Sequence, residues 1–277
     1  MAVKRELIVK NRRSTDRIKF AGVDFTFAFQ PIVDTRTRTV ISHEALIRGI
    51  NNEPAHTVLN GYSGPDIDAF DALCRSRAIE IASRVGINTH LNLNILPSAA
   101  MDVVAGISST IDAADRHKFP LKRMIIEVTE VHAIADPARF ASVLNEYRRA
   151  GLQLAIDDFG AGYAGLTLLS EFQPDIVKLD MGLVRGIQRN GPRQAIVRAI
   201  WQVCVDLGID FLVEGVETID EFSWFTDLGA YIFQGYLFAK PMFEGMPPVN
   251  FPSLKHEELT IPPTQLLTLA ESDVWTN

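Results

Sequence analysis

Short apolar runs alternate with amphipathic stretches along most of the chain. Residues 25–33 and 39–47 have the composition of two strands, and the polar residues 34–38 between them predict a hairpin. The later segments predict strands and helices that follow one another in turn. Strands are expected at 89–96, 121–128, 152–157, 175–179, 211–214 and 231–233, and helices at 70–85, 137–150, 166–172, 192–207 and 219–228.

This alternation favours an α/β fold of the TIM-like (β/α)8 barrel type. Strand-then-helix repeats predict parallel strands covered by helices, and a barrel of about 250 residues would nearly fill the 277 residues present. The opening hairpin implies that one barrel strand runs antiparallel. We expect a basic N-terminal extension at residues 1–20, the barrel at 21–245 and a proline-containing C-terminal tail at 246–277.

Charge and composition narrow the possible partners. The chain is 47% hydrophobic with a net charge of −7, so its charge gives no reason to expect binding to duplex nucleic acid. The first twenty residues carry a local net charge of +5, from seven basic and two acidic side chains. A solvated tail explains this segment better than an arm that binds a partner or steers a nucleotide.

The two cysteines, Cys74 and Cys204, lie far apart in the sequence and suggest neither a disulfide framework nor a CxxC metal site. The sequence shows no apolar segment of the signal-peptide type and no apolar run near the roughly 18 residues needed to cross a bilayer. We therefore expect a cytoplasmic protein that does not associate with a membrane.

Two neighbouring carboxylates, Asp157 and Asp158, close the apolar run 152–157 and precede a glycine-rich turn. Buried like charges raise each other's pKa, so a divalent cation that meets them is one explanation and exposure to solvent is the other. The other predicted strands also place polar side chains at or near their C-terminal ends. These are Glu44, Asn92, Glu127, Lys178, Glu214 and Gln234.

In a barrel these strand ends form one face, where active sites lie. Carboxylates plus an amide match the oxygen ligands of one or two Mg²⁺ or Mn²⁺ ions, and a pair of such ions is a common device for hydrolysing phosphodiesters. One interpretation of Lys178 is an ion pair with a neighbouring carboxylate. The other is an ammonium that contacts the attacking water or a phosphate oxygen, and the two are compatible.

These residues, in this order, resemble the EAL-domain family of cyclic di-GMP phosphodiesterases. The resemblance extends over about residues 24 to 243 and rests on eight ordered segments. They are Gln30-Pro31-Ile32-Val33, Glu44-Ala45-Leu46-Ile47-Arg48, Asn92-Leu93-Asn94, Glu127-Val128-Thr129-Glu130, Asp157–Tyr163, Lys178-Leu179-Asp180, Glu214-Gly215-Val216-Glu217 and Gln234–Pro241.

The resemblance implies a barrel with one antiparallel strand that uses two Mg²⁺ or Mn²⁺ ions to cleave cyclic di-GMP to linear pGpG. It implies that Lys178, Glu44 and Asp157 are catalytic and that Lys178 orients the attacking water. The first metal would be held by Glu44, Asn92, Glu127 and Asp157, and the second by Asp158, Glu214 and the bridging Asp157. Substrate contacts would come from Arg48, which would hold a phosphate, and from Gln30, Leu46, Asp180, Glu217, Gln234 and Pro241. Glu130 would brace the loop through which the subunits of a homodimer couple to the metal site.

The chain also departs from the family pattern. Ala161 and Ala164 occupy positions where many members have Thr and Ser, and residues 49–70 are diverged. Through Arg48-Gly49, Phe70–Ala82 and Asp157–Leu169 the chain also resembles EAL domains attached to light sensors. Its twenty N-terminal residues are too few to form such a sensor, so a sensor or regulatory protein is a further expected partner.

Two other functions are consistent with parts of the sequence. Residues 160–165 match GxGxxG, which suggests a dinucleotide-binding oxidoreductase, but Asp157 and Asp158 would repel a pyrophosphate there. The stronger alternative is a catalytically silent EAL domain that acts as a cyclic di-GMP receptor or binds other proteins. Because every expected metal-ligand position is filled, the sequence favours the enzyme.

Overall fold

Eight strands close into a barrel in the computed structural model, which describes residues 19–20, 23–61, 67–95, 103–129, 137–162 and 165–252. The strands follow chain order, and pairing of the last with the first closes the ring. The first strand is antiparallel to both neighbours, and the other barrel pairs are parallel. The predicted barrel with one antiparallel strand is therefore confirmed. The strands are β2 (Val23–Asp34), β3 (Thr39–Gly49), β4 (His90–Asn94), β5 (Met124–Thr129), β6 (Gln153–Phe159), β7 (Ile176–Leu179), β8 (Asp210–Val213) and β9 (Ile232–Phe233).

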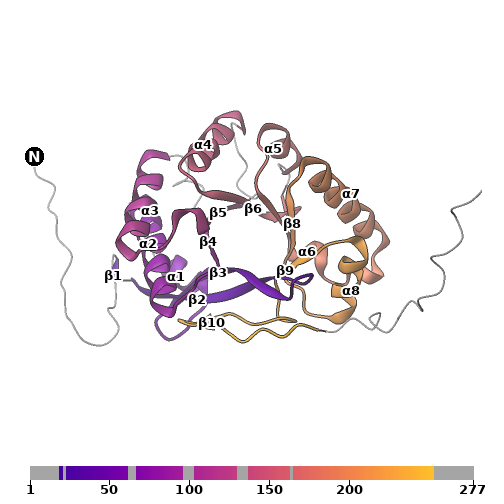
Figure 1. Cartoon of the computed structure of the whole chain (residues 1–277), viewed down its shortest axis with the longest axis horizontal. Helices are drawn as coiled ribbons and strands as arrows, with labels where there is room; N and C mark the ends of the chain where they lie inside the picture. The colour runs from indigo at the N-terminus through magenta and orange to yellow at the C-terminus, as the bar shows by residue number, and fades with distance from the viewer. Residues whose placement is uncertain are drawn as a thin grey trace, which may run out of the picture.

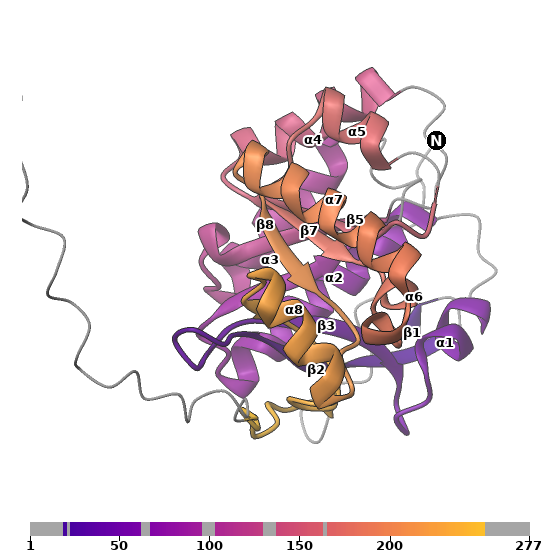
Figure 2. The same ribbon diagram turned by 90° about the vertical axis from the view of Figure 1, so that its right-hand side faces the viewer.

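Helices surround this ring of strands (Figure 1). Figure 2 shows α7 and α8 lying across the outside of the barrel beside β8. Among the described helices, none is both long enough and apolar enough to cross a bilayer. The helices are α1 (Ala55–Gly61), α2 (Ile67–Val85), α3 (Val103–His117), α4 (Pro137–Arg149), α5 (Gly165–Glu171), α6 (Met181–Val184), α7 (Gly191–Leu207) and α8 (Ile219–Leu228), with short 3-10 turns at Leu121–Arg123 and Ile187–Arg189.

The helices α1, α3 and α6 were not predicted from the sequence. Within α3, Gly106 and the run 108–110 of two serines and a threonine have weak helix propensity. Packing against α2 compensates, because the buried Arg75 donates from Nε to Thr110 Oγ1 at 3.0 Å and Thr110 donates back to the carbonyl of Gly106. Tertiary contacts therefore stabilise this helix where the propensity of these residues is weak.

Two short strands add to the outside of β2. β1 (Lys19–Phe20) and β10 (Met242–Phe243) both pair antiparallel with it, and β10 lies along the outer side of the ring (Figure 1). The chain beyond β10 stays against the barrel, since the amide of Asn250 donates to the carbonyl of Phe238 and Phe251 packs on the core. The rest of the predicted extension and tail, residues 1–18 and 253–277, lies outside the described residues.

The barrel interior changes character along its axis. At the end where the parallel strands begin, Ile32, Leu212 and Ile232 form a small apolar cluster of their own. Toward the C-terminal strand ends, buried polar side chains replace apolar ones, among them Glu44, Asn92 and Glu127. Side chains alternate along a strand, so every second residue of a strand points into the barrel. This alternation brings the polar side chains of neighbouring strands together in the interior.

The segment after β9 approaches the loop after β8 closely at this polar end. A Cβ atom added at Gly235 would lie 2.0 Å from the carbonyl oxygen of Val216 and 2.4 Å from its nitrogen. We expect Gly235→Ala to lower the free energy of unfolding by at least about 1–3 kcal/mol, measured by urea denaturation, because backbone atoms cannot move aside cheaply. Gly191→Ala is the matched control, since nothing lies within 4 Å there. Equal stabilities for the two variants would contradict this expectation.

Candidate metal centre

A buried lysine lies at the centre of the candidate site. Lys178, on β7, is fully buried, and its Nζ lies 2.7 Å from a carboxylate oxygen of Glu127 and 2.7 Å from one of Glu214. A carboxylate oxygen of Asp157 is 2.9 Å away and one of Glu44 is 3.7 Å away. The ion pairs that the sequence offered as one interpretation of Lys178 are therefore present, with four carboxylates rather than one.

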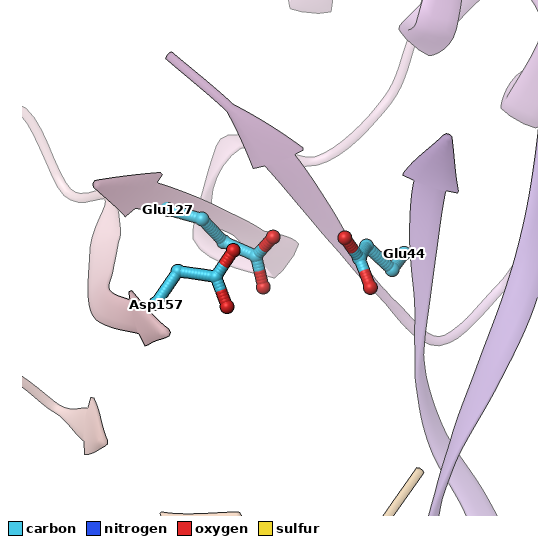
Figure 3. Close-up of side chains that lie close together, drawn as sticks. All are labelled: Glu44, Glu127 and Asp157. Carbon is cyan, nitrogen blue, oxygen red and sulfur yellow. The ribbon is translucent and has the colours of Figure 1, made fainter. Parts of the chain in front are cut away.

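Three of these carboxylates converge from different strands. Glu44 on β3 faces Glu127 on β5 and Asp157 on β6 across the barrel mouth (Figure 3). Each offers an oxygen atom, and these three atoms lie within 4.8 Å of one another. That spacing lets a single divalent cation contact all three.

A second group shares one member with the first. Oxygen atoms of Asp157, Asp158 and Glu214 also lie within 4.8 Å of one another. With Glu44 and Glu127 these residues are called the acidic cluster below. Asp157 belongs to both groups, so its carboxylate stands between two places where a cation could bind.

The backbone at Asp158 explains how two successive residues reach one site. In a regular strand, neighbouring side chains point to opposite faces. Asp158 instead has a φ of 52°, in the left-handed region that few non-glycine residues adopt, and the pairing of β6 with β7 is irregular between Ile156 and Phe159. The break in alternation allows both aspartates to join the same cluster. Such strained backbone concentrates at functional sites.

Amide side chains hold Glu127 in place. Asn92 Nδ2 donates to Glu127 Oε1 at 2.7 Å, and the amide oxygen of Asn92 accepts a hydrogen bond from the Ser42 hydroxyl. Asn92, expected as a ligand of the first metal, thus lies beside the acidic cluster with its oxygen already engaged. Ser42 was not singled out from the sequence, although it shares a strand face with Glu44.

Two further amides hold Glu44. Gln234 Nε2 donates to Glu44 Oε2 at 2.7 Å, and Asn94 Nδ2 donates to Glu44 Oε1 at 3.3 Å. Gln234, expected to contact substrate, therefore positions a carboxylate. Asn94 was given no role from the sequence, although it lies two residues after Asn92 on the same strand, a spacing that places both on one face.

Burial and crowding raise the pKa values of the carboxyl groups. Burial raises the pKa of Glu127 to about 8, and Lys178 only partly opposes it. Burial raises the pKa of Asp158 to about 6, followed by the negative charge of Asp157. The pKa of Glu214 also rises well above its ordinary value because of burial. These carboxyl groups therefore bind a proton more readily than free carboxyls do, because the positive charge around them is too small to stabilise their ionised forms.

Lys178 shows the opposite balance. Burial acts to lower its pKa, but the surrounding carboxylates, Asp157 first among them, outweigh burial and leave the pKa well above its ordinary value. The ammonium therefore stays charged at neutral pH. One ammonium faces the five carboxyl groups of the acidic cluster, so the site keeps an excess of negative charge.

The donor set fits hard divalent cations. Glu127 Oε2 is buried and accepts no hydrogen bond from the described residues. An unsatisfied buried carboxylate oxygen is costly unless a cation or a donor reaches it. Carboxylate oxygens on both sides of Asp157 are the ligands that Mg²⁺ and Mn²⁺ prefer. The chemistry of the site therefore supports divalent-metal binding, with Glu127 and Asp157 as its best-placed ligands.

We expect Mn²⁺ affinity to increase with pH between about 5.5 and 8. The raised pKa values of Asp158 and Glu127 mean that protons occupy these carboxyls at lower pH. A metal must displace those protons, so each one released can tighten binding up to about tenfold per pH unit. Titration calorimetry in buffers with different heats of protonation would count the protons. An affinity that does not change between pH 6 and pH 8 would contradict this expectation.

Two of the residues expected to contact substrate lie on the same strand as Glu44. Arg48 lies two and four residues beyond Leu46 and Glu44 on β3, so all three share a face. Its guanidinium is half-buried and donates to the carbonyl of Ile47. Pro241, also half-buried, leads into β10.

Three of the expected substrate residues bind other parts of the chain. Gln30 is buried and donates from Nε2 to the carbonyl of Ala239 at 3.1 Å. Asp180 caps α6 by accepting from the amide of Gly182. Glu217 pairs with Arg185, which the sequence did not single out. These contacts place each residue within the fold and leave direct substrate contact as a prediction.

The expected regulatory residue Glu130 lies outside the described residues, as do Ala164 and residues 62–66 of the diverged segment. Ala161 is described, and its amide donates to the carbonyl of Asp158 at 3.0 Å. This hydrogen bond holds the first residues of the turn close to Asp158.

Comparison with known proteins identifies related chains. A model of the EAL domain matches residues 16–241. The blue light- and temperature-regulated antirepressor BluF of Escherichia coli is 33% identical over 230 residues, which cover 83% of this chain and 57% of BluF. The cyclic di-GMP phosphodiesterase RocR of Pseudomonas aeruginosa is 34% identical over 164 residues, or 58% of this chain and 41% of RocR. The chain thus spans less than two thirds of either relative.

Solved structures of EAL proteins are also similar to this chain. A standalone versatile EAL protein from Vibrio cholerae O395, in its c-di-GMP bound form, is 42% identical with a TM-score of 0.78, covering 86% of this chain and 98% of that one. BlrP1 of Klebsiella pneumoniae, in a manganese and cyclic di-GMP complex at pH 6, is 36% identical with a TM-score of 0.78, covering 84% and 60%. BlrP1 has also been solved with calcium and cyclic di-GMP.

Proposed function

The chain belongs to the EAL domain family, and from this we propose that it is a metal-dependent phosphodiesterase that hydrolyses cyclic di-GMP to linear 5'-pGpG. The observation that carries the proposal is the double membership of Asp157, whose carboxylate lies within reach of both Glu44 with Glu127 and Asp158 with Glu214. Two acidic groups joined by one aspartate are what a two-metal phosphodiesterase needs. The metal and nucleotide complexes of BlrP1 support the choice of cofactor and substrate.

Each side chain of the site has a role in this proposal. Asp157 would hold both ions, Glu44, Asn92 and Glu127 the first, and Asp158 and Glu214 the second. Bound Mg²⁺ or Mn²⁺ would lower the pKa of a water molecule and neutralise charge on the phosphate. Lys178, which stays charged among the carboxylates, would orient that water by hydrogen bonding. Arg48 would hold a phosphate at the edge of the mouth, where a guanidinium can donate two hydrogen bonds.

A silent receptor or protein-binding domain is the second candidate. The observation that favours it is the name of BluF, which describes an antirepressor and not a phosphodiesterase. We favour the enzyme because each of the five acidic positions expected to bind metal holds a carboxylate, and these side chains converge at one end of the barrel. A homodimer, a sensor or regulatory partner and a cytoplasmic location are also expected from the sequence, and all three stay predictions.

Incubation of the purified chain with cyclic di-GMP and Mn²⁺ tests the proposal. We expect pGpG as the first product by liquid chromatography, its disappearance with EDTA and its return when Mn²⁺ is added in excess. Saturable binding of cyclic di-GMP without any product would indicate a receptor instead. Neither binding nor product would mean that cyclic di-GMP is not the ligand.

A further inference from the structure

A cavity of about 280 Å³ lies at the end of the barrel where the parallel strands begin, opposite the acidic cluster. The turn between β2 and β3 lines one side of it with Arg36 and Arg38, and Tyr231, directly before β9, lines another. Phe222 of α8 and Phe251 of the segment after β10 add two more aromatic rings. The proposed hydrolysis uses none of these residues.

The first arginine of the cavity is fixed in place. The Arg36 guanidinium lies over the Tyr231 ring, with Cζ 3.3 Å from the ring centre, and Nη2 is 3.0 Å from a carboxylate oxygen of Asp34. Tyr231 is held in turn, because its hydroxyl donates to Asp210 at 2.9 Å and its carbonyl accepts from the amide of Thr35 at 2.9 Å. This side of the cavity is therefore formed before any ligand arrives, so that binding requires little ordering of side chains.

The second arginine carries a charge that no described residue neutralises. Arg38 is exposed, its Nη2 donates to the carbonyl of Phe251 at 3.4 Å, and its Cζ lies 5.4 Å from the centre of the Phe251 ring. Among the described residues that line the cavity, none is a carboxylate. Since Asp34 balances Arg36, the guanidinium of Arg38 leaves the cavity positive in a chain whose net charge is −7.

The backbone of Arg38 suits other residue types better than arginine. Its φ is 54°, in the left-handed region where glycine and asparagine are favoured. Strained residues of this kind concentrate at functional sites. An arginine that costs stability in the turn and also lines the cavity indicates a use for its guanidinium beyond the turn itself.

We propose that this cavity binds a small organic anion, that is, a carboxylate or phosphate joined to a flat apolar body. The planar fork of a guanidinium matches a carboxylate or phosphate, and Arg38 binds the anionic group through paired hydrogen bonds with Arg36 beside it. The apolar body lies against Phe222 and Phe251, since ligand sites combine apolar walls with a few placed polar groups. The site does not depend on the proposed function, because it shares no residue with the acidic cluster.

Titration of the isotope-labelled full chain with phenyl phosphate and with benzoate, followed by NMR, tests the site. EDTA is present throughout, so that no metal in the acidic cluster attracts the anions. We expect both probes to bind the wild type at millimolar or lower concentrations. Arg38→Asn should weaken binding about tenfold or more, the effect of losing hydrogen bonds to a charged group. Arg38→Lys keeps the charge without the paired donors and should weaken binding less than Arg38→Asn does.

Arg116→Gln is the matched control, since Arg116 is exposed and lies outside the cavity, and it should bind both probes as the wild type does. Because asparagine suits the left-handed conformation, Arg38→Asn should unfold at the same urea concentration as the wild type or a higher one, which separates a lost contact from misfolding. Unchanged affinity in Arg38→Asn, or no binding of either probe at millimolar concentrations, would overturn the site. Inorganic phosphate that binds as tightly as phenyl phosphate would overturn the role given to the apolar walls.

Discussion

The Lys178→Met variant should lose hydrolysis of cyclic di-GMP and unfold far more easily than the wild type when metals are removed. Lys178 is fully buried and lies within 4 Å of carboxylate oxygens of four residues. Removal of one partner from a buried ionic network leaves unpaired charge and costs about 3–5 kcal/mol. Because the ammonium would also orient the attacking water, turnover should fall by about 10²-fold or more.

Urea denaturation in EDTA and in Mn²⁺ measures this effect. We expect the loss of stability in Lys178→Met to be largest in EDTA, because bound cations would replace part of the missing positive charge. Arg149→Met is the control, since Arg149 pairs with Glu146 at the surface with its side chain 74% exposed. Removal of a surface pair changes stability by about 0–1 kcal/mol. Equal losses in the two variants, or full turnover in Lys178→Met, would contradict the role given to Lys178.

The Asp157→Asn variant should lose turnover while it keeps its fold. Asp157 belongs to both acidic groups, so its replacement removes a ligand from each candidate position at once. We expect the turnover rate to fall by about 10³-fold or more and Mn²⁺ binding to weaken. The fold should persist, because Lys178 keeps Glu127, Glu214 and Glu44 as partners and the cluster loses one of its crowded negative charges.

Asp210→Asn provides the matched control, because Asp210 begins β8 at the opposite end of the barrel and is exposed. Steady-state kinetics and Mn²⁺ titration of both variants separate the roles of the two aspartates. Turnover in Asp157→Asn at the level of Asp210→Asn would mean that Asp157 does not bridge two metals.

The barrel could be predicted from the sequence because each of its strands is a distinct apolar run. The helix at 219–228 was placed correctly, and the structure shows that a capping box of Thr218 with Glu221 begins it and that Gly229 ends it in the left-handed conformation. The helix α3 was missed because its serines, threonine and glycine have weak helix propensity, although its apolar residues recur at helical spacing, and its packing on Arg75 is not visible in one sequence.

The convergence of the candidate site was predictable in outline, since strand ends of parallel strands meet at one face. The sequence placed Glu44, Glu127 and Lys178 at that face, and the structure brings them together. Strand alternation alone could not predict that Asp158 joins Asp157, because that arrangement depends on a left-handed residue within β6.

Contacts that support the site were harder to foresee. The pairs of Ser42 with Asn92 and of Arg185 with Glu217 join residues 50 and 32 positions apart. No local pattern connects such residues until the barrel closes. Gln30 had been expected to contact substrate, and its bond to Ala239 shows that it anchors the segment between β9 and β10.

The number and position of bound metals test the central claim most directly. Crystals of the chain grown with Mn²⁺ and cyclic di-GMP can be measured at the manganese absorption edge, where anomalous scattering locates each ion. The account predicts two peaks about 3.5–4 Å apart, one on either side of the Asp157 carboxylate. A single peak, or peaks that do not contact Asp157, would contradict the two-metal site.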